Sequence, residues 1–152
     1  MIACFGETPP LDTWIAAQPR AFSACENTIA FARALEARGC AAIHASTGGV
    51  SPQQKIPLSA GYQVPYARRI KAEVGLPTIA VGLITEPEQA EAIIANGEAD
   101  AVSLARAMLY DPRWPWHAAA KLGATVKAPP QYWRSQPREF KDLFENAAFG
   151  AR

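Results

Sequence analysis

At 152 residues, 49% of them hydrophobic, the chain is long enough for one ordinary domain with a buried core. A formal net charge of +1 argues against general electrostatic binding to nucleic acid or to an anionic membrane surface. No apolar run approaches the roughly 18 residues that span a bilayer, and the three cysteines form neither a C-x-x-C pair nor a regular framework, so we expect a cytoplasmic protein with reduced thiols and no metal site.

The first elements of the chain are an aperiodic segment and then a repeated pattern. Residues 1–28 show no convincing period, and we predict an irregular leader there. From residue 29 the pattern of helix, glycine and buried strand occurs three times, which predicts a domain of about three βα units over 29–126. The predicted helices cover 29–35, 64–74 and 90–94, the glycines are Gly39, Gly75 and Gly97, and the strands are 41–45, 78–81 and 101–105.

Helix-start signals add detail to the second half of the chain. Thr85 with Glu88 three residues later predicts a capping box, and Asp111 followed by Pro112 predicts an N-cap with a first-turn proline. The last helix is predicted to end at Gly123. The tail, 127–152, is proline-rich and then charged and aromatic, so we expect it to be irregular or only locally helical.

Two unusual residues follow consecutive predicted strands. Such alternation favours an α/β fold with a parallel sheet, in which ligands gather at the carboxyl ends of the strands. Gly82 follows one strand and can expose its backbone N–H groups, whereas Arg106 follows the next and carries a forked cationic donor. The pair suits a phosphate monoester. A tight turn at Gly82 and a solvated Arg106 are the alternative explanation.

Three segments carry a family resemblance. They are "HASTGGVSPQQKIPLSAGYQVPYARRIK", "VGLITEPEQAEAIIANGEADAVSLARAMLYDPRWPWHAA" and "APPQYWR". Together they resemble the C-terminal part of the old yellow enzyme family, in its xenobiotic-reductase-like branch of NAD(P)H-dependent flavin oxidoreductases. The resemblance implies a partial TIM (β/α)₈ barrel whose strands are the sixth to eighth.

The resemblance also implies a set of site residues. Val81 would lie beside the flavin ring of FMN, and Gly82, Ala105 and Arg106 would hold its phosphate. Trp133 and Arg134 lie on a segment that, in this branch, reaches the active site of a neighbouring subunit; an exposed surface tail is the alternative for these two.

The family's N-terminal half, which carries its catalytic residues, is not recognisable in this chain, and we assign no catalytic residue. We expect a C-terminal fragment of an ene-reductase-type enzyme that takes hydride from NAD(P)H through FMN to an activated alkene. Self-association or a homo-oligomer is expected, since open parallel strands leave unpaired backbone groups. The alternative is a non-catalytic remnant or assembly module that binds no flavin alone.

Other candidate residues receive structural interpretations. His44 within a strand is interpreted as a hydrogen-bonded structural residue, and His117 as a packing residue. The glycine-containing stretch at 46–55 lacks the spacing of a phosphate-binding P-loop and is interpreted as the loop after the sixth strand. Cys25 and Cys40 have no partner that would make either a nucleophile.

Overall fold

A four-stranded sheet organises the first part of the protein. The computed structural model describes residues 2–4, 26–47, 53 and 58–147. The strands are β1 (Ile2–Cys4), β2 (Ile43–Ala45), β3 (Thr78–Ala80) and β4 (Ala101–Val102), and they lie in the order β1-β2-β3-β4. β2, β3 and β4 pair in parallel, which confirms the predicted α/β class with a parallel sheet.

The pattern of burial along the strands separates two faces of the sheet. In β2 the outer two residues, Ile43 and Ala45, are buried, and His44 between them is half-buried. β3 repeats this alternation, with Thr78 and Ala80 buried, as expected for side chains that alternate across a strand. Helix α3 (Val64–Glu73) packs on β2 and β3 with its buried residues Val64, Ala67 and Ile70, so helix and sheet form one core.

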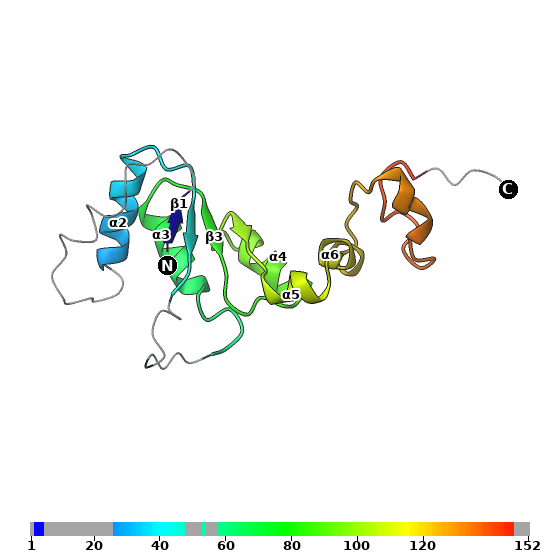
Figure 1. Cartoon of the computed structure of the whole chain (residues 1–152), viewed down its shortest axis with the longest axis horizontal. Helices are drawn as coiled ribbons and strands as arrows, with labels where there is room; N and C mark the ends of the chain where they lie inside the picture. The colour runs from blue at the N-terminus through cyan, green and yellow to red at the C-terminus, as the bar shows by residue number, and fades with distance from the viewer. Residues whose placement is uncertain (1, 5–25, 48–52, 54–57, 148–152) are drawn as a thin grey trace. The chain divides into compact units, whose positions relative to one another are not determined.

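The helices follow the predicted pattern closely. In sequence α2 (Glu26–Glu36) precedes β2 and α4 (Pro87–Ala95) precedes β4, as predicted. α2 packs against α3 (Figure 1). After α2 and α4 the chain turns through Gly39 and Gly97, whose φ angles are +81° and +69°. Gly75 has no positive φ, so the turn after α3 does not depend on glycine in the same way.

Asp100 ties the starts of β3 and β4 together. Its Oδ2 accepts the backbone N–H of Thr78 at 2.8 Å, and its Oδ1 accepts the ammonium of Lys71 at 2.8 Å. The hydrogen bond from Lys71, followed by that from Thr78, holds the pKa of Asp100 below its usual value. The carboxylate therefore stabilises the strand register from outside the sheet.

The chain divides into two compact units. The first contains residues 1–84 and 90–104, and the second contains residues 85–89 and 105–152. The second unit contains α5 (Arg106–Tyr110), α6 (Trp114–Leu122) and the 3₁₀ helix η1 (Pro130–Ser135). α6 ends at Gly123, whose φ of +68° and ψ of +25° place it in the left-handed conformation, as predicted for that glycine.

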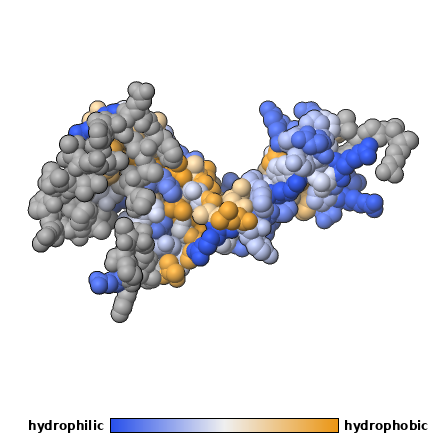
Figure 2. All heavy atoms as spheres, in the orientation of Figure 1, coloured by the Kyte–Doolittle hydropathy of each residue, from blue (hydrophilic) through white to orange (hydrophobic). Residues whose placement is uncertain are grey.

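The second unit has a small core of its own. Ala119 of α6 is buried with Leu143 and Phe144 of the tail, and Trp116 and Trp133 pack around them. The backbone of Val126 bonds to that of Leu143 and Glu145, at 2.8 and 2.9 Å, which holds the end of the tail against the segment after α6. On the visible face the tail is largely hydrophilic (Figure 2), and its described arginines and Lys141 are exposed.

Several local predictions were wrong. The leader is not irregular throughout, since Ile2–Cys4 pair antiparallel with β2. The strands predicted over 41–45, 78–81 and 101–105 are shorter than predicted, most clearly β4, which ends at Val102. The expectation of reduced thiols also fails for Cys40, which is in a disulfide bond.

The predicted helix starts are shifted. The side chain of Gln89, not Glu88, accepts the backbone N–H of Thr85, at 3.2 Å, whereas the Glu88 carboxylate pairs with Lys121 at 2.9 Å. The last helix begins at Trp114 with Arg113 as its N-cap, so Asp111 and Pro112 precede it. None of the helices in the described part of the chain is both long and apolar enough to cross a membrane.

Candidate functional site

The turn after β3 has a backbone that only glycine adopts readily. Gly82 is buried and has a φ of +117°. A Cβ at this position would lie 3.0 Å from both Cβ and Cγ of Gln63 and 3.1 Å from the backbone nitrogen of Gln63. Dihedral and space together therefore require glycine at the end of β3.

Gln63 connects the carboxyl ends of two neighbouring strands. Its side chain is buried and donates from Nε2 to the carbonyl of Thr47, two residues after β2, at 3.0 Å. Close by, the N–H of Gly61 donates to the carbonyl of Gly82 at 2.9 Å. The segment before α3 thus fixes both the exit of β2 and the turn after β3.

Sequence reasoning missed Gln63. Its position directly before Val64 and Pro65 is typical of a helix N-cap, but its side chain makes no capping hydrogen bond. The contact with Thr47 spans 16 positions, and no local pattern indicates a contact of that range.

Arg106 follows β4 as the first residue of α5. Its side chain is exposed and forms no ion pair with any residue that the structure describes. Ala105 precedes it as the N-cap and is also exposed, and its carbonyl accepts the N–H of Leu109 at 3.1 Å. The guanidinium is thus available to an anion from outside the described chain.

The predicted site residues divide between the two units. Val81, which is half-buried, and Gly82 belong to the first unit, whereas Ala105 and Arg106 belong to the second. Their convergence on one ligand therefore stays a prediction. Most of the predicted loop at 46–55 lies outside the described residues, as does Cys25.

Both histidines differ from their interpretation as satisfied packing residues. The Nε2 of His44 is buried and lacks a hydrogen-bond partner in the described part of the chain, and burial lowers the pKa of His44. His117 is exposed on α6, and its Nδ1 lies 2.6 Å from Oδ2 of Asp111. Among the described residues no group of three or more His, Cys, Asp or Glu side chains could hold a metal ion.

The tail residues Trp133 and Arg134 lie in η1. The indole N–H of Trp133 donates to the carbonyl of Ala128 at 2.9 Å, and its ring is half-buried against the small core of the second unit. Arg134 is exposed. A freely exposed aromatic tail is therefore the wrong description of Trp133, and a contact of this pair with another subunit stays a prediction.

A family profile matches most of the chain. The NADH:flavin oxidoreductase / NADH oxidase family profile aligns with residues 22–124. The chain belongs to this family. This confirms the resemblance to the old yellow enzymes. The range that the profile matches contains the predicted site residues Val81, Gly82, Ala105 and Arg106, but it does not contain Trp133 or Arg134.

Individual relatives agree with the family assignment. The chain is 43% identical over 106 residues to an NADPH dehydrogenase of Geobacillus thermodenitrificans, covering 70% of this chain and 31% of that protein. It is 46% identical over 106 residues to an NADPH dehydrogenase of another Geobacillus strain, with the same coverage. An NADPH dehydrogenase of Listeria monocytogenes is 43% identical over 113 residues, covering 72% of this chain and 32% of that protein. This family member thus spans about a third of the length of these curated relatives.

Proposed function

We propose that the chain is the part of an FMN-dependent NAD(P)H:flavin oxidoreductase that holds the phosphate of FMN. In this proposal β2, β3 and β4 are the sixth, seventh and eighth strands of a TIM barrel. The family membership and the parallel pairing of the three strands support it, because barrels of this kind commonly bind phosphate in the loops after the last two strands.

The observation that carries the proposal is the glycine-only turn at Gly82. Its φ of +117° and the close approach of Gln63 fix the backbone of this turn at the carboxyl end of β3, and barrels of this kind commonly bind phosphate at such strand ends. Arg106, which follows the next strand, has an exposed guanidinium without an ion-pair partner among the described residues. A fixed turn after one strand and an unneutralised cation after the next fit the phosphate end of FMN.

Each residue then has a defined role in binding. Arg106 pairs two phosphate oxygens through its fork of N–H donors, and the backbones of Gly82 and Ala105 donate to the remaining oxygens. Val81 packs beside the flavin ring. Bound FMN would supply the hydride transfer from NAD(P)H to an activated alkene, and the names of the relatives favour NADPH as the reductant.

Titration of the purified chain with FMN tests the proposal. Flavin absorbance and fluorescence quenching give the Kd for the unchanged chain, for Arg106→Ala and for Arg138→Ala. Arg138 is the matched control, since it is an exposed arginine of the tail outside the proposed site. A hydrogen-bonded charge pair contributes about 1.5–3 kcal/mol to the free energy of binding. Its loss in Arg106→Ala should raise the Kd for FMN by roughly 10- to 150-fold, whereas Arg138→Ala should leave the Kd unchanged. Equal affinities of the two variants would remove Arg106 from the site.

One observation favours a second function, that of a non-catalytic assembly module. β1 pairs antiparallel with β2, whereas the strands of a (β/α)₈ barrel are all parallel. With β1 in place, β2 cannot also pair with a fifth barrel strand at that edge. A colourless chain that takes up no added FMN at any concentration would support this alternative.

The remaining features of the proposal concern location and assembly. We propose a cytoplasmic homo-oligomer in which Trp133 and Arg134 contact a neighbouring subunit. Trp133 is already anchored to Ala128 in its own chain, so Arg134, which is exposed, is the residue of the pair that can reach outward. Sedimentation of Arg134→Ala at several concentrations tests this contact.

A further inference from the structure

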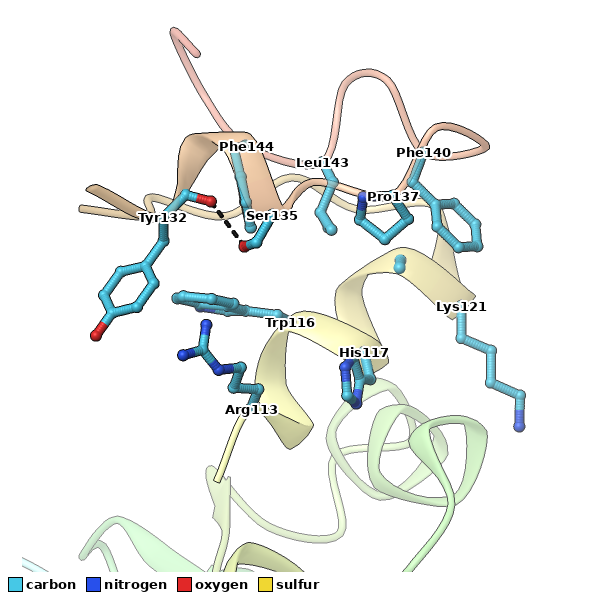
Figure 3. Close-up of a pocket in the computed structure, with 11 residues that line it drawn as sticks. Arg113, Trp116, His117, Lys121, Tyr132, Ser135, Pro137, Phe140, Leu143 and Phe144 are labelled. Atoms are coloured by element: carbon cyan, nitrogen blue, oxygen red, sulfur yellow. Dashed lines mark hydrogen bonds between the residues drawn. The ribbon is translucent and has the colours of Figure 1, made fainter. Parts of the chain in front are cut away.

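The second unit contains a groove between α6 and the tail. It has a volume of about 500 Å³, within the range typical of small-molecule sites. One wall comes from α6 and the other from Tyr132 and the segment that follows it (Figure 3). The tail wall lies beyond residues 22–124, the range that the family profile matches.

The aromatic side of the groove is held in place by contacts on two sides. Trp116 meets Tyr132 edge-on, with ring centroids 5.4 Å apart, and meets Phe144 edge-on at 5.1 Å. Phe144 is buried, and its backbone N–H donates to Oε1 of Gln136 at 2.9 Å. Such a surface exists before any ligand arrives, which lowers the entropy cost of binding.

Three basic side chains line the groove, and no acidic side chain does. Lys121 is already balanced by Glu86 and Glu88, which lie outside the lining, and the Nδ1 of His117 lies 2.6 Å from Oδ2 of Asp111. Arg113 differs from both. In the described part of the chain its guanidinium forms no ion pair.

Arg113 is instead positioned by the two aromatic rings. Its guanidinium carbon lies 4.9 Å from the ring centre of Trp116 and 4.5 Å from that of Tyr132, and the three side chains point toward one another (Figure 3). The two rings are inclined at 65° to each other, so the flat guanidinium can stack face to face on at most one of them. Those of its N–H groups that point to neither ring are available to a planar anion in a bidentate pair.

We propose that this groove binds a small aromatic carboxylate. The carboxylate pairs with Arg113, and the aromatic body lies against Trp116, Phe140 and Leu143. Phe140 lines the groove and keeps 39% of its surface exposed, so a ligand there covers apolar surface that the protein leaves in water. A single unbalanced cation matches a monoanion, which favours a carboxylate over a phosphate dianion. The proposal is independent of FMN binding.

Calorimetric titration of the full chain with naphthoate and with its neutral analogue naphthylmethanol tests the proposal. Naphthoate should bind about tenfold or more tightly than the alcohol, and Arg113→Gln should remove that preference. Arg138→Gln, which changes an exposed tail arginine outside the lining, should retain it. The indole N–H resonance of Trp116 should shift on binding, whereas that of Trp114, which donates to the carbonyl of Thr85, should not.

Arg113→Lys provides a second variant that retains the charge if Arg113→Gln does not fold. Lysine cannot present a planar fork, so naphthoate should bind this variant severalfold more weakly. The proposal is overturned if naphthoate does not bind, if the alcohol binds as tightly, or if both Arg113 variants bind naphthoate like the unchanged chain.

Discussion

Replacement of Gly82 by alanine should destabilise the first unit more than the same replacement at the other described glycines that follow a helix or a strand. Two costs add at this position. A positive φ costs an L-residue about 1–2 kcal/mol, and the φ of Gly82 is +117°. The new Cβ would also lie 3.0 Å from the Gln63 side chain and 3.1 Å from its backbone nitrogen, and overpacking of this kind costs about 1–3 kcal/mol. The sum is a loss of about 2–5 kcal/mol in the free energy of unfolding.

Gly97→Ala separates the two costs. Gly97 also has a positive φ, +69°, but a Cβ there would meet no atom within 4 Å. Urea denaturation followed by far-UV circular dichroism should therefore show a loss of only about 1–2 kcal/mol for Gly97→Ala. Equal losses in the two variants would refute the argument that Gln63 closes the space beside Gly82.

Two further predictions concern stability. Asp100→Asn should lower the free energy of unfolding by about 1 kcal/mol or less, since the carboxylate is 42% exposed. Because hydrogen bonds from Lys71 and Thr78 lower the pKa of Asp100, its contribution to stability is present above the ordinary aspartate pKa of about 4 and is lost as pH falls below it. Urea denaturation midpoints measured across that pH range should therefore change less in the variant than in the unchanged chain. Phe144→Ala should cost about 3–5 kcal/mol because Phe144 is buried, whereas thermal melting should show a much smaller loss for the half-exposed Phe140→Ala.

The alternation of helix, glycine and strand was predictable because each signal is local. Apolar positions such as Ala67 and Ile70 recur at helical spacing and are buried in α3. Gly97 and Gly123 follow helices and adopt the positive φ that β-carbon sterics deny to most residues. The element types were therefore correct even where their ends were shifted.

The errors arose where distant contacts override local preference. Apart from Ser103, the residues are apolar as far as Ala105, but the described ladder ends when the N–H of Ser103 donates to the carbonyl of Ala80, and Ala105 is the N-cap of α5. The three-residue strand β1 is too short to show a period. The tail looks irregular in sequence because its order comes from burial of Leu143 and Phe144 against α6.

The candidate site was predictable only residue by residue. Glycine and arginine at strand ends indicate backbone donors and a cation. The structure gives Gly82 a positive φ and Arg106 an exposed side chain, and their roles in binding stay a prediction. Gln63, which shapes the Gly82 turn, acts through Thr47, 16 positions away. Arg113 acts through Tyr132, which is 19 positions away by residue number and belongs to another element.

The antiparallel pairing of Ile2–Cys4 with β2 sets a threshold for any strand supplied by a second molecule. A segment tethered to the same chain competes at an effective concentration in the millimolar range. A free strand at ordinary protein concentrations would need to pair with β2 much more strongly than β1 does in order to displace β1. Addition of a strand from a second molecule at this edge therefore depends on the concentration of that molecule as much as on how well its backbone pairs with β2.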